Sequence, residues 1–258
     1  MKVGRAILLL VLMSAAATGA FAAWDMSCRP RFRAVANGVE YARYTVSAVR
    51  YHALARVAVL RVDPAAARLG IVSFDCKRSH VRELVRSAGA TAGVNGSYFD
   101  ETGRPLGLTI SNGKTLTPLR AVDWGVFYLD SSGAHLAHTR EFSNAADVSF
   151  AIQCGPRLVL DGRPVKLKMQ SSRRTAIGAD AAGRVLLVVT TGQPMRMDEF
   201  ARLLCAETVR GGLGCRWALN LDGGASSQMF LETEGAACDI PGADEVANAV
   251  VVFSAKNP

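Results

Sequence analysis

Short strand-like runs separated by glycine and Asx residues are the feature that most constrains how this chain can fold. The runs alternate apolar with polar residues or are rich in β-branched residues, which is typical of strands. In the first half they cover Glu40–Val49, Ala55–Val62, Leu69–Ser73, Thr91–Asn95, Leu106–Ser111 and Trp124–Leu129. In the second half they cover Leu158–Leu160, Arg174–Gly178, Arg184–Thr191, Trp217–Leu221, Gln228–Leu231 and Ala247–Phe253. Asp161-Gly162 and Ala182-Gly183 are expected to form hairpin turns between neighbouring runs.

Only two segments have helical spacing. Ser79 is expected to cap the first helix, which ends at Gly89, and the second is expected over Met197–Val209, before Gly211-Gly212. The apolar faces of the two consist of Val81, Leu84 and Val85, and of Phe200, Leu203, Leu204 and Val209. Because helices do not alternate with strands, a doubly wound parallel sheet is disfavoured. We predict an α+β fold, a single domain around a mixed, strand-rich sheet with a few flanking helices.

The first residues predict export. Lys2 and Arg5 precede an uninterrupted apolar run over Ala6–Met13, and Ala20-Phe21-Ala22 has the small-x-small pattern of a cleavage site. Residues 1–22 are therefore predicted to be a signal peptide, and the mature protein to be periplasmic or secreted. The alternative is an uncleaved anchor helix over Ala6–Ala23. No later stretch is long and apolar enough to cross a bilayer, so no membrane span is expected after cleavage.

The charge of the chain gives a weak indication of its partners. Half of the 258 residues are hydrophobic, which supports a real core, and the formal net charge is +8, or +6 without Lys2 and Arg5. The basic residues are scattered, with no basic run interleaved with aromatic residues, so no nucleic-acid partner is expected. No repeat or linker divides residues 24–258, and the oligomeric state is left open.

An exported chain with six cysteines is expected to form disulfides. Fifteen pairings are possible, of which we favour Cys28 with Cys76 and Cys205 with Cys215. No two cysteines have the C-x-x-C spacing of a zinc or redox site, so no metal site is predicted from them.

Three polar segments stand at predicted strand ends, where structural chains rarely need them. They cover Asn95–Asp100, Arg173–Gly178 and Asn220–Ser227. In the third, a buried strand delivers Asn220 and Asp222, two glycines let backbone amides approach a ligand, and serines add hydroxyl groups. Such a loop suits phosphate or sugar hydroxyls. The alternative for each segment alone is an ordinary turn, since Asn-Gly and Asp-Gly favour turns.

Taken together and in order, these segments resemble the phosphodiester glycosidase family, whose animal member removes N-acetylglucosamine from a phosphodiester on lysosomal glycans. Val94–Asp100 is similar to the family's Asn-Gly-Gly-Phe/Tyr-Phe segment, Pro105–Gly113 to the Leu-Gly, strand and Asx-Gly that follow, and Arg174–Gly178 matches Arg-Thr-Ala-Ile-Gly. Leu219–Ser226 is similar to Asn-Leu-Asp-Gly-Gly-Gly-Ser and Val246–Val252 to the closing strand. The resemblance implies that residues 91–258 form the catalytic region and that residues 24–90 are an N-terminal strand-rich portion of the same domain.

The resemblance and the residue chemistry imply site roles. Asp222 is the candidate catalytic carboxylate and Arg174 the candidate phosphate clamp, because its planar fork suits two phosphate oxygens. Asp100 is the candidate second carboxylate, with a turn residue as the alternative, and Arg173 is expected to face solvent. The residues predicted to bind substrate are Asn95, Gly96, Thr175, Asn220, Gly223, Gly224 and Ser226. For Arg174 the alternative is a buried structural ion pair.

The expected partner is a sugar 1-phosphodiester, similar to an N-acetylglucosamine 1-phosphodiester, or a related cell-envelope glycan. No cofactor is expected, while a bound Ca²⁺ is left open. Ser97 and Ala225 stand where the family usually has glycine, so the sugar and the aglycone are left open as well. The alternative from another class is a non-catalytic carbohydrate-binding or exopolysaccharide-assembly protein of the envelope.

Overall fold

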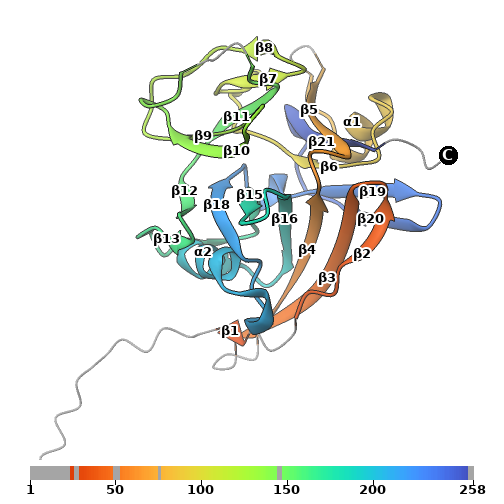
Figure 1. The fold of residues 1–258 in the computed structure, drawn as a ribbon, viewed down its shortest axis with the longest axis vertical. Helices are drawn as coiled ribbons and strands as arrows, with labels where there is room; N and C mark the ends of the chain where they lie inside the picture. Colours follow the sequence, from red (N-terminus) through yellow and green to blue (C-terminus); the bar gives the residue numbers. More distant parts are fainter. Residues whose placement is uncertain (1–23, 26–28, 49–52, 75–76, 144–146, 255–258) are drawn as a thin grey trace, which may run out of the picture.

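A computed structural model describes residues 24–25, 29–48, 53–74, 77–143 and 147–254 (Figure 1). About half of the chain is strand, 51 %, against 10 % helix, so the fold is broadly α+β but mostly β. The predicted signal peptide and the predicted Cys28–Cys76 disulfide lie outside the described residues. No helix in the described ranges is long and apolar enough to cross a membrane.

The largest sheet has nine strands. Its order is β1-β3-β4-β16-β15-β18-β12-β13, with β2 also paired to β3. The strands are β1 Trp24–Asp25, β2 Arg33–Ala36, β3 Val39–Ala48, β4 Ala53–Val62, β12 Arg157–Leu160, β13 Arg163–Pro164, β15 Thr175–Asp180, β16 Val185–Gly192 and β18 Cys215–Asn220. The turns expected at Asp161-Gly162 and Ala182-Gly183 join β12 to β13 and β15 to β16, which confirms both hairpins.

Two five-stranded sheets and a short ribbon complete the strands. The β6 sheet has the order β20-β19-β6-β21-β5, with β5 Ala67–Ser73, β6 Ala92–Asn95, β19 Met229–Thr233, β20 Ala236–Ile240 and β21 Asn248–Ser254. The β9 sheet, green at the top of Figure 1, has the order β10-β9-β11-β7-β8, with β7 Thr109–Ser111, β8 Lys114–Thr117, β9 Gly125–Asp130, β10 Gly133–His138 and β11 Phe150–Cys154. The ribbon pairs β14 Ser171–Ser172 with β17 Met195–Arg196.

The prediction of one mixed sheet is wrong, because all pairings between the described strands are antiparallel and the strands form several sheets. Short connections produce antiparallel hairpins, as between β3 and β4, between β9 and β10 and between β19 and β20. The strands of residues 24–90 are shared between the sheets, since β4 pairs with β16 and β5 with β21.

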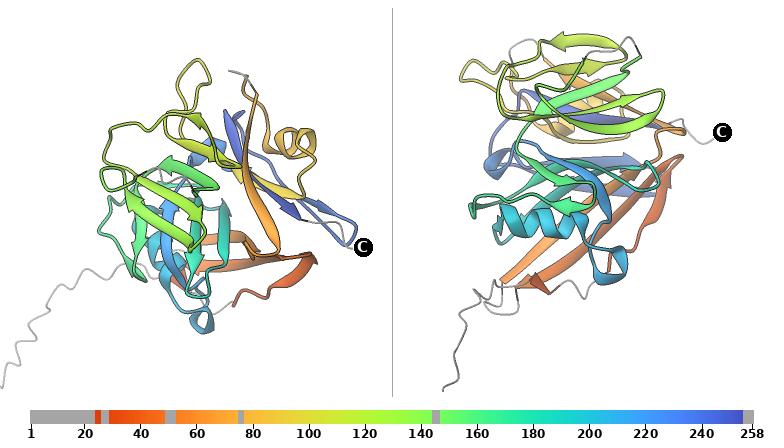
Figure 2. Two further views of the ribbon diagram at one scale, coloured as in Figure 1. Left: turned by 45° about the horizontal axis from the view of Figure 1, so that its top comes forward. Right: turned by 60° about the vertical axis from the view of Figure 1, so that its left-hand side comes forward.

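The main core brings together side chains from the three large sheets. Figure 2 shows the arrangement of these sheets in two further views. Each sheet contributes fully buried side chains to it, among them Leu60 and Leu187, Val94 and Val250, and Phe127 and Ile152. The alternation of apolar residues along the strands produces this core, because every second side chain points to the same face.

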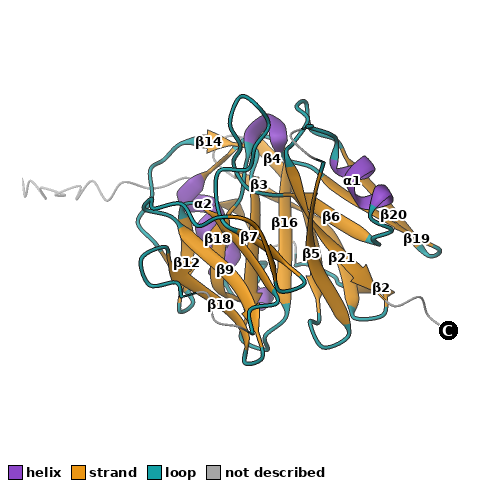
Figure 3. Cartoon of the chain, turned by 90° about the horizontal axis from the view of Figure 1, so that it is seen from above, coloured by secondary structure: helices purple, strands orange, loops and turns teal. Residues whose placement is uncertain are grey.

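Two helices cover outer faces of the sheets, on opposite sides of the molecule (Figure 3). Helix α1, Val81–Ser87, packs on the β6 sheet through Val81, Leu84 and Val85, as predicted. Its N-cap is His80 and not Ser79, whose hydroxyl donates to the Glu83 carboxylate instead. Helix α2, Met197–Cys205, packs on the nine-stranded sheet through Phe200, Leu203 and Leu204.

Helix α2 ends earlier than the sequence predicts. A turn of 3-10 helix, η1 Thr208–Arg210, follows it, and Val209 is 58 % exposed, so Val209 is not part of the apolar face. A second short 3-10 turn, η2 Gly224–Ser226, follows β18. Strands β8, β11 and β20 follow from none of the patterns above, although β8 and β20 form hairpins with the neighbouring strands β7 and β19.

The predicted Cys205–Cys215 disulfide is wrong: Cys154, Cys205, Cys215 and Cys238 are free thiols. The Cys205 Sγ donates to the Arg202 carbonyl 3.5 Å away, within its own helix. The Cys215 Sγ lies under Gly178, where an added Cβ would be 3.1 Å from it.

Candidate functional site

The three polar segments predicted from the sequence meet in space. Asn95 is the last residue of β6, Thr175 the first of β15, and Asp222 follows the end of β18. The Asn95 Nδ2 donates to the Asp222 carbonyl at 2.6 Å, and the Thr175 hydroxyl donates to the Asn95 Oδ1 at 2.9 Å. Asn95 thus ties the end of the β6 sheet to two strands of the nine-stranded sheet, and the segments form one site.

Asn95 and Thr175 are completely buried, which changes the role predicted for them. The second bond to the Asn95 Oδ1 comes from the backbone N–H of Gln228 at 3.0 Å, so both ends of the amide have partners within the protein. These two side chains position the site and do not face a ligand.

Gly96 is required by the packing beside Asn95. A Cβ on Gly96 would lie 2.1 Å from the Asn248 Oδ1, which accepts a hydrogen bond from the Ser97 N–H at 2.9 Å. The carbonyl of Gly96 accepts from the Asp222 N–H at 3.0 Å. Close approach of two backbones therefore needs a residue without a side chain at this position.

Asp222 is half-buried in the loop that follows β18. Its Oδ1 accepts from the Gly223 N–H at 2.9 Å. Burial raises the pKa of the Asp222 carboxyl above its usual value, although hydrogen bonds from the Ser226 side chain and from Gly223 lower it. The charge of Asp244 raises the same pKa further. Asp222 consequently keeps its proton to a higher pH than an exposed aspartate, which suits a general acid.

The glycine turn after Asp222 packs tightly on the Arg173 backbone. The Gly224 N–H donates to the Arg173 carbonyl at 2.9 Å, and a Cβ on Gly223 would lie 2.9 Å from the same oxygen. Gly224 has φ +62°, a left-handed conformation that glycine adopts without strain. The predicted substrate-binding residues Gly223, Gly224 and Ser226 therefore shape the loop that holds the Asp222 carboxyl.

Asn220 holds a buried oxygen with no partner. Its Nδ2 donates to the Gly155 carbonyl at 2.9 Å and to the Leu221 carbonyl at 2.6 Å, and lies 3.2 Å from the Tyr98 hydroxyl. The Asn220 Oδ1 has no hydrogen-bond partner among the residues that the structure describes, although nearly all buried polar atoms have one. It is a buried acceptor close to Asp222 in the chain.

Arg174 is 4 % exposed and forms no ion pair with a described residue. Its Nε donates to the Met195 carbonyl at 3.0 Å and one Nη donates to the Gln170 carbonyl. Burial lowers the pKa of the Arg174 guanidinium. A buried guanidinium without a carboxylate retains an uncompensated positive charge, which favours the anion-binding role over the ion-pair alternative.

The sequence predicts that Arg173 faces solvent, but the structure exposes it only in part. It is half-buried, and one Nη donates to the carbonyls of Ser227, at 2.7 Å, and Pro241, at 3.1 Å. The Arg173 Nε is buried without a partner, and burial lowers the pKa of this guanidinium too. Two neighbouring arginines thus bring positive charge to the site without bound carboxylates.

Asp100 is a turn residue in the structure. Its Oδ1 accepts from the N–H and the hydroxyl of Thr102, at 2.9 and 2.6 Å, and from the Arg104 N–H at 3.0 Å. These bonds lower the pKa of the Asp100 carboxyl. These contacts are those of a turn residue, which was the alternative for Asp100. They give no support to its assignment as the second carboxylate.

The sequence analysis missed three side chains that complete the site. The Tyr98 hydroxyl donates to the Gly155 carbonyl at 2.5 Å, and the Gln228 side chain bonds the Val81 N–H and the Asp244 carbonyl at 3.0 and 2.7 Å. The Asn248 side chain accepts a hydrogen bond from the Ser97 N–H and donates one to the Ser97 hydroxyl. The signal in the sequence was an amide side chain at the start of a predicted strand or beside it, as at Gln228 and Asn248. A buried amide needs hydrogen-bond partners, which other strands must supply.

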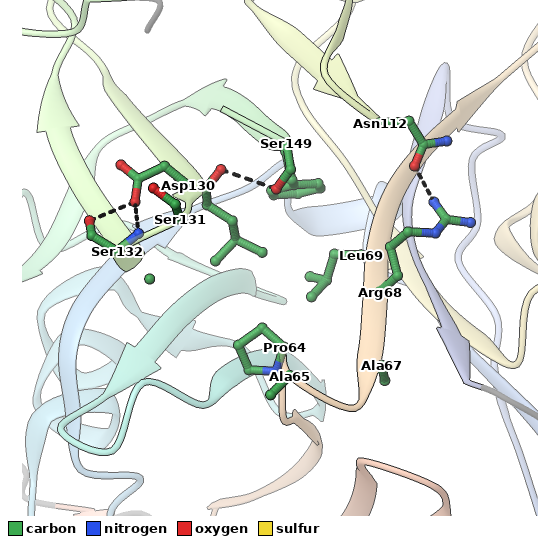
Figure 4. A pocket seen from close by; sticks show the side chains of 13 residues that line it. Pro64, Ala65, Ala67, Arg68, Leu69, Asn112, Asp130, Ser131, Ser132 and Ser149 are labelled. Carbon is green, nitrogen blue, oxygen red and sulfur yellow. Dashed lines mark hydrogen bonds between the residues drawn. The ribbon is translucent and has the colours of Figure 1, made fainter. Parts of the chain in front are cut away.

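No group of three or more metal-ligating side chains occurs in the described ranges. A separate cavity of about 350 Å³ lies at the other end of the β6 sheet (Figure 4), where it is lined by Pro64, Leu69, Asn112, Ser132, Phe150 and neighbouring residues. Ala249 of β21 pairs with Asn95, whereas Ser254 pairs with Ala67 at the cavity, so roughly 17 Å of strand separates the two. The cavity contains none of the residues of the three polar segments. The polar site, where these segments meet, is therefore the stronger candidate.

Comparison with known proteins identifies the family. The profile of the family described as phosphodiester glycosidase matches residues 88–253, which is more than half of the chain. The chain belongs to the phosphodiester glycosidase family. The match covers all three polar segments, so the resemblance seen in the sequence is confirmed.

The relatives of this family member that we compared are distant in sequence. The uncharacterized protein YigE of Escherichia coli (strain K12) is 31 % identical over 152 residues, which are 54 % of this chain and 57 % of YigE. The chain thus matches little more than half of the length of that relative. The site of the family member described here is therefore interpreted from its own geometry.

Solved structures share its fold. The auto-inhibited catalytic domain of zebrafish N-acetylglucosamine-1-phosphodiester alpha-N-acetylglucosaminidase superimposes with a TM-score of 0.70 at 18 % identity, covering 88 % of this chain and 89 % of that one. A hypothetical protein from Synechocystis superimposes with a TM-score of 0.58 at 16 % identity, covering 84 % of this chain and 62 % of the other. At these identities the likeness concerns the fold.

Proposed function

We propose that this chain is an exported hydrolase that cleaves the glycosyl bond of a sugar 1-phosphodiester. The observation that carries the proposal is a half-buried carboxyl with a raised pKa, Asp222, in one site with a buried arginine that has no acidic partner, Arg174. The charges of both groups act on the Tyr98 hydroxyl, whose pKa the Asp222 charge raises and the Arg174 charge lowers. In a glycosyl phosphate, the acid suits the glycosyl bond and the cation suits the phosphate, and both groups lie near one tyrosine.

The reaction breaks the bond between the anomeric carbon and the phosphate oxygen. Water supplies the new oxygen on the sugar, and the leaving group is a phosphate monoester. The protonated Asp222 donates its proton to the leaving oxygen as that bond breaks. Arg174 stabilises the charge on the phosphate, because a guanidinium can donate two parallel hydrogen bonds to phosphate oxygens.

The family name and the zebrafish enzyme support a sugar such as N-acetylglucosamine, and a related cell-envelope glycan is a wider possibility of the same chemistry. The predicted signal peptide supports a periplasmic or secreted location, where such glycans occur. The proposal needs no organic cofactor, since each step uses a side chain of the site.

The test measures sugar release by the mature protein from UDP-N-acetylglucosamine, from a synthetic N-acetylglucosamine 1-phosphodiester and from plain nitrophenyl glycosides. We expect release from the phosphodiester substrates and its loss in Asp222→Asn, with an unchanged circular dichroism spectrum. Release from the nitrophenyl glycosides alone would contradict the phosphodiester specificity. Binding of envelope glycans without any release would favour the carbohydrate-binding alternative.

A further inference from the structure

A loop over residues 241–246 lies directly against the glycine turn that holds Asp222. The backbone N–H groups of Ala243 and Asp244 both donate to the Ala225 carbonyl, at 2.9 and 3.2 Å. The Gln228 Nε2 donates to the Asp244 carbonyl at 2.7 Å, and Arg173 donates to the Pro241 carbonyl at 3.1 Å. Four hydrogen bonds therefore hold the backbone of this loop beside the turn, two of them at Asp244.

The far end of this loop is also tied to the protein. The Val246 N–H donates to the Ser79 carbonyl at 2.9 Å, and Val246 is 2 % exposed. Gly242 packs so closely that a Cβ there would lie 2.5 Å from the Ala225 carbonyl. The position of Asp244 relative to Asp222 is consequently set by the fold and not by the Asp244 side chain.

The Asp244 side chain itself has no hydrogen-bond or ion-pair partner among the described residues, and it is exposed. The nearby donors, including Arg173, donate to backbone carbonyls of the loop. The Asp244 carboxylate therefore remains exposed to solvent. Its charge reaches Asp222, because it raises the pKa of that carboxyl. The other titratable groups that interact with Asp222 are Tyr98 and Cys154, both protonated at neutral pH because burial raises their pKa values.

We propose that Asp244 is the second catalytic carboxylate of the site, the base that takes a proton from the attacking water. The assignment rests on the proposed function, since glycosyl hydrolysis canonically uses two carboxyl groups in different protonation states. Asp222, half-buried on the turn, is the acid, and Asp244, exposed on the loop against the turn, is the base. Asp100 is replaced in this role, because its Oδ1 is occupied by its own turn.

The step balances with water as the only co-reactant. The water oxygen forms a bond to the anomeric carbon while the bond from that carbon to the phosphate oxygen breaks. One proton of the water passes to Asp244, and the proton of Asp222 passes to the leaving phosphate oxygen. Solvent then returns a proton to Asp222 and removes one from Asp244, which restores both groups.

The experiment compares Asp244→Asn with Glu245→Gln, a matched change at the neighbouring exposed carboxylate. With the synthetic N-acetylglucosamine 1-phosphodiester as substrate, we expect kcat to fall about 10²–10⁴-fold in Asp244→Asn and to stay within about twofold in Glu245→Gln. Sodium azide should restore turnover in Asp244→Gly and yield a glycosyl azide, since the small anion replaces the activated water. A purely structural Asp244 would give no such product.

The outcomes separate the two proposals. Sugar release by the wild type that Asp244→Asn leaves unchanged overturns the role of Asp244 and retains the proposed function. No release by the wild type from any phosphodiester overturns the function and the role together. A carboxyl titration by NMR adds a readout without turnover: Asp244→Asn should lower the pKa of Asp222, and an unchanged titration contradicts the proximity on which the role depends.

Discussion

The side-chain amide of Asn95 donates to the backbone carbonyl of Asp222 at 2.6 Å and so joins two sheets at the residue that we propose as the acid. The two positions are 127 residues apart in the chain. The bond holds the backbone of Asp222 and leaves its carboxyl free for the turn and for a ligand.

Removal of the Asn95 side chain should destabilise the protein. Asn95→Ala leaves the Thr175 hydroxyl, the Gln228 N–H and the Asp222 carbonyl buried without this partner. We expect the free energy of unfolding to fall by about 2–4 kcal/mol, measured by urea denaturation. Thr175→Val removes one donor only and should cost about 1 kcal/mol. Equal losses in the two variants would contradict the junction role.

Gly96→Ala should disturb the same junction through packing. The new Cβ would lie 2.1 Å from the Asn248 Oδ1, so Asn248 must move away from Ser97. We expect a loss of about 1–3 kcal/mol in the free energy of unfolding. Gly235→Ala is the matched control, because nothing lies within 4 Å of a Cβ there, and it should change stability by less than about 0.5 kcal/mol.

The titration of Asp222 should appear in both stability and turnover. Burial raises its pKa in the folded state, so the group favours folding most below its unfolded pKa and loses that contribution as the pH rises through the folded pKa. Asp222→Asn should therefore gain stability relative to the wild type as the pH rises above the unfolded pKa of an aspartate, about 3.9, measured by urea denaturation. Turnover by the wild type should decline as the pH rises through the folded pKa of Asp222, since the acid loses its proton. A difference in stability that is constant with pH would contradict the raised pKa.

Arg174→Lys should weaken the binding of phosphate-bearing substrates. Lysine keeps the charge but loses the planar fork, which is anchored on the carbonyls of Met195 and Gln170. We expect KM for the phosphodiester to rise about 10–100-fold, with a smaller change in kcat. Arg216→Lys, at an exposed ion pair with Asp161, is the control and should leave KM unchanged. An unchanged KM in Arg174→Lys would assign the guanidinium to structure alone.

The cysteines should differ in reactivity. Cys205 is half-buried, whereas Cys154 is fully buried, which raises the pKa of the Cys154 thiol to about 12. Iodoacetamide attacks the thiolate, so in the native protein Cys205 should be alkylated well before Cys154, followed by mass spectrometry. Denaturation should remove the difference. A Cys205 that resists alkylation until a reductant is added would instead indicate the disulfide predicted from the sequence.

Much of the local structure could be predicted, because it depends on neighbours in the chain. The period of two in Ala53–Val62 and the turn chemistry of Asp161-Gly162 each act within a few residues, so both were predicted from the sequence. Strand β11 could not be predicted, since its partners β7 and β9 are not joined to it by a tight turn. Strand β20 was missed although it forms a hairpin with the neighbouring strand β19. The antiparallel pairing and the division into several sheets are properties of long-range contacts.

The sequence by itself determined the family, the strand-rich fold class and the segments that form the site. Motifs and hydrophobic periods depend only on residues that are close together in the chain. The tertiary structure decided what each side chain does there. Burial turned Asn95 and Thr175 into positioning residues, gave Asp222 a raised pKa and left Arg174 without an acid. It also brought Asp244 to the turn of Asp222 and occupied Asp100 in its own loop. Desolvation and contacts between distant segments exist only once the sheets have packed, and they set protonation and access.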